Sequence, residues 1–109
     1  MSTGILPPAG LTPRVAEVTV ALIEAWNTSP PGWYPSIAEI HLYDSARVTT
    51  DETMHALREA AGQGLAEDVW PGWQPTGKAQ QLHRRLEEWF YTATWPAEPL
   101  PATAGEVER

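Results

Sequence analysis

The chain has 109 residues, of which 42% are hydrophobic, and it contains no cysteine. This length predicts one domain with a single modest core, and the lack of cysteine excludes disulfides, cysteine-based zinc sites and thiol catalysis. The formal net charge is −7 at pH 7, whereas a nucleic-acid-binding protein normally presents a basic face that displaces counterions from phosphate.

The two ends of the chain differ in composition from the middle. Residues Met1 to Leu11 are too rich in Pro and Gly for a signal peptide, and we expect a flexible segment over residues 1–11. From Pro96 onward Pro, Ala and Glu dominate, which predicts a disordered acidic tail over residues 96–109. The folded domain is expected over residues 12–95. Because no apolar run reaches membrane-spanning length, we expect a soluble, cytoplasmic protein with no membrane partner.

The first predicted helix begins at Thr12, which can cap it, with Pro13 in its first turn. Its apolar residues recur at helical spacing and are Val15, Val18, Leu22, Ile23 and Trp26. Two prolines and a glycine between Asn27 and Gly32 end this helix. Trp33-Tyr34, directly before Pro35, suits a short extended segment.

Two shorter helices are predicted next. Ser36 can cap a helix that ends near Asp44-Ser45. Its inner side is expected to hold Ile37, Ile40 and either Leu42 or Tyr43. Thr49 and Glu52 form a capping-box pattern for a third helix, which Gly62 and Gly64 end. The buried face of the third helix is expected to hold Met54, Leu57, Ala60 and Ala61.

A hairpin and a last helix complete the predicted domain. The segments Leu65 to Val69 and Trp73 to Pro75 flank Trp-Pro-Gly, which is turn chemistry. Thr76 can cap the last helix, whose apolar stripe holds Ala79, Leu82, Leu86, Trp89, Phe90 and Ala93. We expect Trp26, Leu57 and Leu86 to share one core.

Three blocks of sequence follow one another in a recognisable order. They are Pro35-Ser-Ile-Ala-Glu-Ile, Ala56-Leu-Arg-Glu-Ala-Ala-Gly-Gln-Gly-Leu-Ala-Glu and Gly72-Trp-Gln-Pro-Thr-Gly-Lys-Ala. In this order and spacing the chain resembles bacterial winged helix-turn-helix regulators of the MarR and PadR type, from about Pro13 to Tyr91. The resemblance implies a mostly α fold with a small β wing, in which the third helix enters the major groove of DNA. It also implies a transcriptional regulator that forms a homodimer through the first or last helix.

The chain departs from that family in the link between its second and third helices. Such proteins usually have a compact turn with Gly there, whereas Tyr43-Asp-Ser-Ala-Arg-Val-Thr-Thr makes a longer link without Gly. If duplex DNA is bound, the candidate contacts on or before the third helix are Arg47, Thr50, His55 and Arg58. The candidate contacts to the phosphate backbone are Lys78, Arg84 and Arg85.

The charges around the third helix favour a different partner. Between Thr49 and Lys78 the basic residues are Arg58 and Lys78, whereas the acidic ones are Asp51, Glu52, Glu59, Glu67 and Asp68. Carboxylates at the start of this helix suit its dipole but repel phosphate. The alternative function is therefore an acidic winged-helix module that binds a protein partner, or a DNA mimic that does not bind DNA.

Aromatic residues gather in the two predicted sheet segments. Trp33, Tyr34, Trp70 and Trp73 exceed what a small wing needs for packing. Trp70 and Trp73 are candidates for binding a protein partner, because Trp is enriched among interface hot spots. The alternative is that Trp70 folds back on Pro71 or on the third helix.

No pattern in the sequence points to catalysis. His41, His55 and His83 are scattered, and Ser, His and Asp are not ordered into a triad. Gly62-x-Gly64 lacks the third glycine and the preceding strand of a dinucleotide-binding loop, and Gly77-Lys78 is followed by Ala79 rather than by the Ser or Thr of a phosphate-binding loop. We therefore expect no catalytic residues, no metal site and no cofactor, and we do not expect an enzyme.

Overall fold

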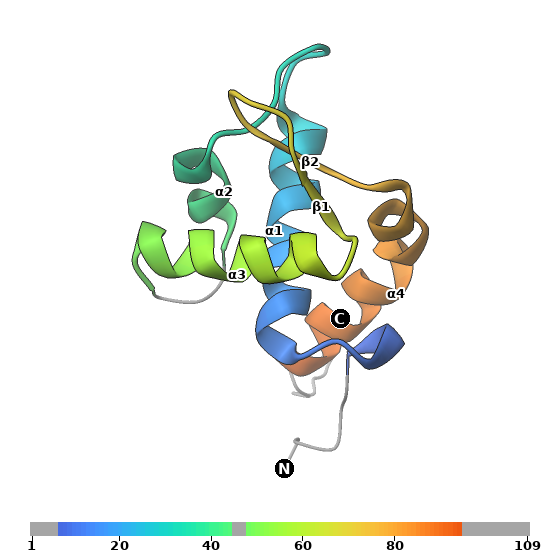
Figure 1. Cartoon of the computed structure of the whole chain (residues 1–109). Helices are drawn as coiled ribbons and strands as arrows, with labels where there is room; N and C mark the ends of the chain where they lie inside the picture. Colours follow the sequence, from blue (N-terminus) through green and yellow to red (C-terminus); the bar gives the residue numbers. More distant parts are fainter. Residues whose placement is uncertain (1–6, 45–47, 95–109) are drawn as a thin grey trace, which may run out of the picture.

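The fold is four helices and one β-hairpin, shown by a computed structural model that describes residues 7–44 and 48–94 (Figure 1). In chain order the elements are α1 (Pro13–Thr28), α2 (Ile37–Tyr43), α3 (Thr50–Gly62), β1 (Ala66–Asp68), β2 (Trp73–Pro75) and α4 (Gly77–Thr94). A 3-10 helix over Pro8–Gly10 precedes α1. The predicted fold class, mostly α with a small β wing, is confirmed.

Local capping explains why the helices begin where they do. The Thr12 hydroxyl accepts a hydrogen bond from the Val15 backbone N–H at 3.2 Å. Ser36 and Thr49 each form a complete capping box with the glutamate three residues later. The Thr76 hydroxyl accepts from the Ala79 N–H at 3.2 Å and starts α4. All four predicted caps are confirmed.

Helix α1 is the centre of the core. It runs through the middle of the molecule, with α2 and α3 on one side and α4 on another (Figure 1). Nine of its residues are buried, namely Val15, Ala16, Val18, Thr19, Val20, Ala21, Leu22, Ile23 and Ala25. Because the apolar surface of α1 is used inside the protomer, α1 is a poor candidate for the predicted dimer contact. The dimer itself stays a prediction.

The predicted core is confirmed for Leu57 and Leu86, which are fully buried, but Trp26 remains half-buried. Trp26 belongs to the last turns of α1, beyond the part that α3 and α4 cover, where it lines a surface pocket with the loop that follows. On α2, Ile40 is fully buried, whereas Leu42 and Tyr43 are both exposed. Tyr43 instead makes a 3.0 Å hydrogen bond with the Thr28 hydroxyl.

The junction between α2 and α3 is fixed by one buried carboxylate. Asp44 caps the end of α2, and its side chain is 0% exposed. Its carboxylate accepts two hydrogen bonds from Arg14, at 2.8 and 2.5 Å, and one at 2.9 Å from the hydroxyl of Thr53. The hydrogen bond to Asp44 raises the pKa of Arg14 above its ordinary value, against the opposing effect of burial. The Asp44 side chain thus joins the end of α2 to α1 through an ion pair and to α3 through a hydrogen bond.

The hairpin packs on the segment that precedes α2. Strands β1 and β2 are antiparallel, with Ala66 opposite Pro75 and Asp68 opposite Trp73. The first strand is shorter than the predicted Leu65 to Val69. The backbone N–H of Trp73 donates to the Pro35 carbonyl at 3.0 Å. The segment Trp33-Tyr34, which was predicted to be extended, forms no strand. The bond between Trp73 and Pro35 joins the hairpin to the residue that follows this segment.

The described core extends beyond the predicted N-terminal boundary of the domain. Leu11, expected in the flexible segment, is buried, and the 3-10 helix before it packs on α4. The predicted tail from Pro96 lies outside the described residues, as do residues 1–6 of the predicted flexible segment.

Replacement of Gly72 by Ala should destabilise the fold. A Cβ atom at Gly72 would lie 2.5 Å from the backbone oxygens of both Tyr34 and Pro35. Overpacking against backbone typically costs about 1–3 kcal/mol, so the urea midpoint of Gly72→Ala should fall. Gly62→Ala is the matched control, because nothing lies within 4 Å of its added Cβ. Equal midpoints for the two variants would contradict this account of the wing.

Replacement of Asp44 by Asn should lower the free energy of unfolding more than replacement of an exposed carboxylate does. The change leaves the partly buried Arg14 guanidinium with only the more exposed Glu17 carboxylate as counter-charge, and we expect a loss of about 3 kcal/mol in the free energy of unfolding. Asp51→Asn on the exposed first turn of α3 should cost less than about 1 kcal/mol. Equilibrium unfolding in urea measures both. A similar small loss for the two variants would show that the buried ion pair does not hold the junction.

Candidate functional site

The residues proposed to read DNA are exposed along α3. Thr50, His55 and Arg58 are all exposed on this helix, whereas Arg47 lies outside the described residues. His55 Nε2 lies 3.7 Å from a carboxylate oxygen of Glu59. The N-terminal half of the exposed face also carries Asp51, so carboxylates surround the single arginine.

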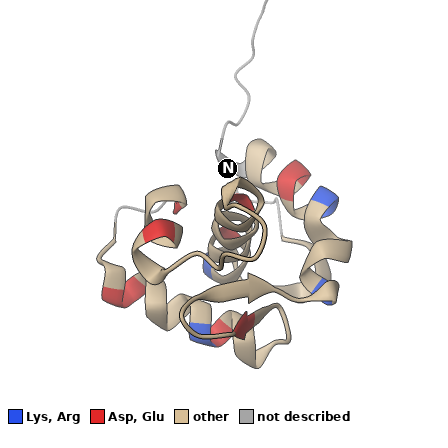
Figure 2. Ribbon diagram, turned by 90° about the horizontal axis from the view of Figure 1, so that it is seen from above, with Lys and Arg blue, Asp and Glu red and all other residues tan. Residues whose placement is uncertain are grey.

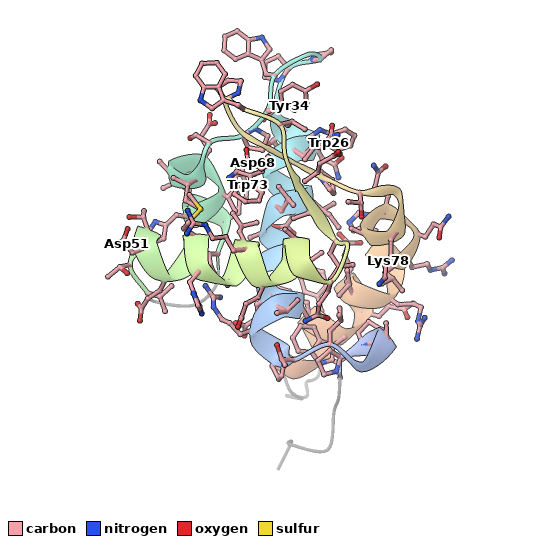
Figure 3. The ribbon with its side chains drawn as sticks, viewed as in Figure 1. Trp26, Tyr34, Asp51, Asp68, Trp73 and Lys78 are labelled. Carbon is pink, nitrogen blue, oxygen red and sulfur yellow. The ribbon has the colours of Figure 1, made fainter. Side chains whose placement is uncertain are left out.

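The residues proposed to contact phosphate do not extend that surface into a basic strip. The Lys78 ammonium donates to the Gln63 backbone carbonyl at 2.9 Å, at the opposite end of α3 from Asp51 (Figure 3). Arg84 lies 3.7 Å from Glu88 on the exposed side of α4, and Arg85 is exposed on the same helix. The predicted basic residues are thus spread over two helices, with carboxylates between them.

A groove runs between α3 and the hairpin. It consists of two hollows of about 410 and 230 Å³, which share Ile37, Met54 and Arg58. Asp51 lines the first hollow, and Asp68 and Trp70 line the second. We call this the wing groove. It has an apolar floor, one arginine and a carboxylate toward each end.

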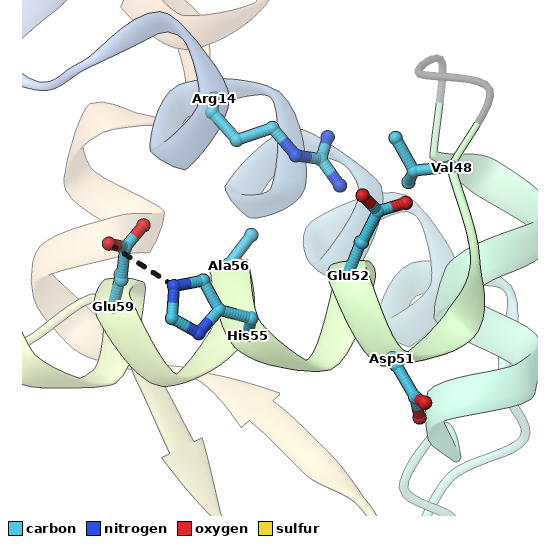
Figure 4. Close-up of a pocket in the computed structure, with 7 residues that line it drawn as sticks. All are labelled: Arg14, Val48, Asp51, Glu52, His55, Ala56 and Glu59. Carbon is cyan, nitrogen blue, oxygen red and sulfur yellow. Dashed lines mark ion pairs between the residues drawn. The ribbon is translucent and has the colours of Figure 1, made fainter.

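A separate hollow, also of about 410 Å³, lies outside the wing groove between α3 and α1 (Figure 4). Arg14 reaches into it, but this arginine is bound to Asp44, and the Glu52 carboxylate accepts from the Thr49 N–H in the capping box. Arg14 and Glu52 therefore already have structural roles. Within the described ranges, no cluster of three or more His, Asp or Glu could hold a metal ion.

The end of the molecule beside the wing groove is aromatic and exposed. Trp70 at the hairpin turn is 86% exposed, Trp33 is 69% exposed, and Tyr34 is also exposed. Trp70 therefore does not fold back on Pro71 or α3. The backbone contacts of Gly72 and Trp73 with residues 34 and 35 bring these two segments side by side. We call Trp33, Tyr34 and Trp70, with the half-buried Trp26, the aromatic end.

Of the two residues predicted to bind a protein partner, Trp73 is buried, and the prediction for it is wrong. It is only 6% exposed and belongs to the core, because side chains alternate along β2 and position 73 faces inward. Figure 3 shows Trp73 behind the hairpin, between α1 and α3. Trp33 and Tyr34 were recognised in the sequence as an excess of aromatic residues, but not as candidates for binding a partner.

Basic residues are absent from the segments that form this end. Residues 24–44 and 59–77 contain no Lys or Arg, while they contain Glu24, Glu39, Asp44, Glu59, Glu67 and Asp68. In the view from above, acidic positions lie along α3 and the hairpin, and basic positions are few (Figure 2). Asp68 Oδ1 also accepts a 3.3 Å hydrogen bond from the Trp70 N–H, which places a carboxylate at the tip of the wing.

Three titratable side chains, Glu24, His83 and Glu87, lie between α1 and α4, away from the aromatic end. His83 Nε2 is 3.1 Å from a carboxylate oxygen of Glu87. Burial raises the pKa of Glu24 above its ordinary value; the charge of Glu87 adds to this effect and His83 opposes it. Burial of Glu24 against α4 therefore favours the protonated form of its carboxyl group.

Comparison with protein-family models, with curated proteins and with solved structures finds no match to this chain. The winged-helix regulator family therefore stays an expectation drawn from the sequence blocks. In the part of the chain that the structure describes, no helix is both long and apolar enough to cross a membrane.

Replacement of Glu24 by Gln should stabilise the protein in a pH-dependent way. Because the folded state raises the pKa of Glu24, its protonated form is favoured on folding, and this stabilisation is lost as pH rises through the folded pKa. Glu24→Gln should therefore melt higher than the parent near pH 8 and converge with it near about pH 3. A difference in melting temperature that is constant across this range would contradict the assignment.

Proposed function

We propose that this domain is a winged helix-turn-helix module that recognises a protein partner through its aromatic end, rather than through contacts to DNA bases. The observation that carries the proposal is the 86% exposure of Trp70 at the tip of a wing that has no basic residue. Contiguous exposed apolar patches mark interaction sites, and Trp and Tyr are among the residues enriched in interface hot spots.

The charge distribution supports the same proposal. A wing that enters or follows a DNA groove needs cations against phosphate, whereas β1 carries Glu67 and Asp68 and the turn carries Trp70. At the start of α3, Asp51 is exposed where a recognition helix would approach the bases. These carboxylates would add repulsion at both places.

DNA binding remains the second candidate, and one observation favours it. Arg58 is exposed in the middle of α3 and lines both hollows of the wing groove. An arginine at such a position can contact a guanine base in the major groove. With a single arginine opposed by Asp51 and Asp68, duplex DNA binding should be weak and should fall steeply as salt rises.

Two assays on one set of variants separate the candidates. The full chain, immobilised, is tested for capture of protein from an extract of its source cells, and separately for binding of random-sequence duplex DNA at low salt. We expect Trp70→Ala to abolish capture, because truncation of a central Trp removes a hot spot. Leu42→Ala is the matched control: Leu42 is 80% exposed but lies outside the aromatic end, and its loss should leave capture unchanged.

The opposite pattern of results would support DNA binding. Under that outcome the parent binds duplex DNA, Arg58→Ala abolishes binding and Trp70→Ala has no effect on it. The double variant Asp51→Asn, Glu52→Gln should then bind DNA more tightly, since it removes two negative charges while the Gln side chain can keep accepting from Thr49. If neither the parent nor this double variant binds DNA, the regulator function is excluded.

A further inference from the structure

A pocket at the C-terminal end of α1 lies within the aromatic end. It has a volume of about 350 Å³, and Trp26 from α1 and Trp33 from the following loop line it together with Asn27, Pro30 and Pro31. Pro30 and Pro31 are exposed and restrict the loop backbone around the pocket. Two indoles and two prolines therefore form a preorganised aromatic recess, with no charged side chain in its lining.

The end of α1 and its indole rings can favour a positively charged ligand in this pocket. The pocket lies at the C-terminal end of α1, which is the negative end of the helix dipole. The faces of indole rings attract cations, and Trp is the most effective residue for this. Glu39 belongs to α2, and Glu67 and Asp68 belong to β1, in the segments that follow the pocket or pack beside it.

No cation of these segments competes for the pocket. Residues 24–44 and 59–77 contain neither Lys nor Arg. Of the basic residues in the described part of the chain, Arg14 binds Asp44, Lys78 binds the Gln63 carbonyl and Arg84 pairs with Glu88. Arg58 lines the wing groove on α3, and Arg85 lies on α4. A cation in this pocket must therefore come from outside these groups.

We propose that the pocket between Trp26 and Trp33 binds an arginine side chain of the protein partner, carried by an extended basic segment that continues across Trp70. This inference rests on the proposed function and adds the chemistry of the partner to it. A planar guanidinium can stack on the face of an indole ring, and its fork of donors can bond polar groups at the rim of the pocket. An extended segment with prolines would fit the aromatic surface without much loss of entropy.

A defined peptide pair tests the charge requirement. The full ¹⁵N-labelled chain is titrated with a short capped peptide of alternating proline and arginine, and with the same peptide carrying citrulline, the neutral analogue of arginine. We expect the arginine peptide to shift the indole N–H signals of Trp26, Trp33 and Trp70 in a saturable way. The citrulline peptide should bind about tenfold more weakly, the loss expected for a partly desolvated cation–π contact.

A variant pair tests the location. Trp33→Leu removes one wall of the pocket at a position that is 69% exposed, so the fold should survive. It should weaken the arginine peptide about tenfold and leave the citrulline peptide nearly unchanged. Leu42→Ala, on a different exposed surface, should bind both peptides as the parent does. Equal affinity of the parent for both peptides, or no effect of Trp33→Leu, would overturn the arginine pocket.

The remaining outcomes separate this inference from the proposed function. If both peptides bind equally well and shift Trp33 and Trp70, the arginine pocket is wrong, but the aromatic end remains a protein-binding surface. If neither peptide binds up to its solubility limit, the arginine pocket is also wrong, and the capture assay with Trp70→Ala still decides the proposed function. If duplex DNA alone shifts the same indole signals, both proposals are wrong.

Discussion

The arrangement of the three N-terminal helices depends on the buried contact of Asp44 with Arg14 and Thr53. A buried carboxylate is costly unless it is paired and fully hydrogen-bonded, and here it accepts three hydrogen bonds from two other helices. His41 also donates to the Val48 carbonyl at 2.7 Å across the same junction. Together these contacts hold α2 against α3, and the link between the two helices contains no glycine.

The second constraint is the close approach of the hairpin turn to the chain before α2. Gly72 has no room for a side chain because the backbone of Tyr34 and Pro35 lies directly against it. This contact has a consequence for the surface. It sets residues 33–34 beside the turn that carries Trp70, so two segments far apart in sequence lie together at one end of the molecule (Figure 1). The side chains of Trp33, Tyr34 and Trp70 are exposed there.

Interactions between residues close in sequence were predictable, whereas contacts across the fold were not. The caps at Thr12, Ser36 and Thr49 could be identified because each involves groups three residues apart. The pairing of Arg14 with Asp44 spans 30 residues and leaves no local pattern. Periodicity likewise placed Trp26 on the apolar stripe of α1. It could not show that this stripe extends beyond the part of α1 that other elements cover.

The candidate site shows the same division. The excess of aromatic residues near the wing was visible in the sequence, but the roles of Trp70 and Trp73 depend on which side of the hairpin each one faces. Trp73 faces inward on β2, while Trp70 belongs to the exposed hairpin turn. Gly72 was assigned to the turn, yet its necessity comes from the close approach of the Tyr34–Pro35 backbone.

The conflict between fold and charge follows from what each one requires. A winged helix-turn-helix fold needs an apolar core, capped helices and a hairpin, and none of these requires a basic surface. DNA binding requires in addition that cations outnumber carboxylates where α3 and the wing meet phosphate. Here Arg58 faces Asp51 and Asp68 around the wing groove. The sequence meets the requirements of the fold but not the charge requirement of DNA binding. Recognition of a protein through the aromatic end needs no excess of cations, and it therefore agrees better with this surface.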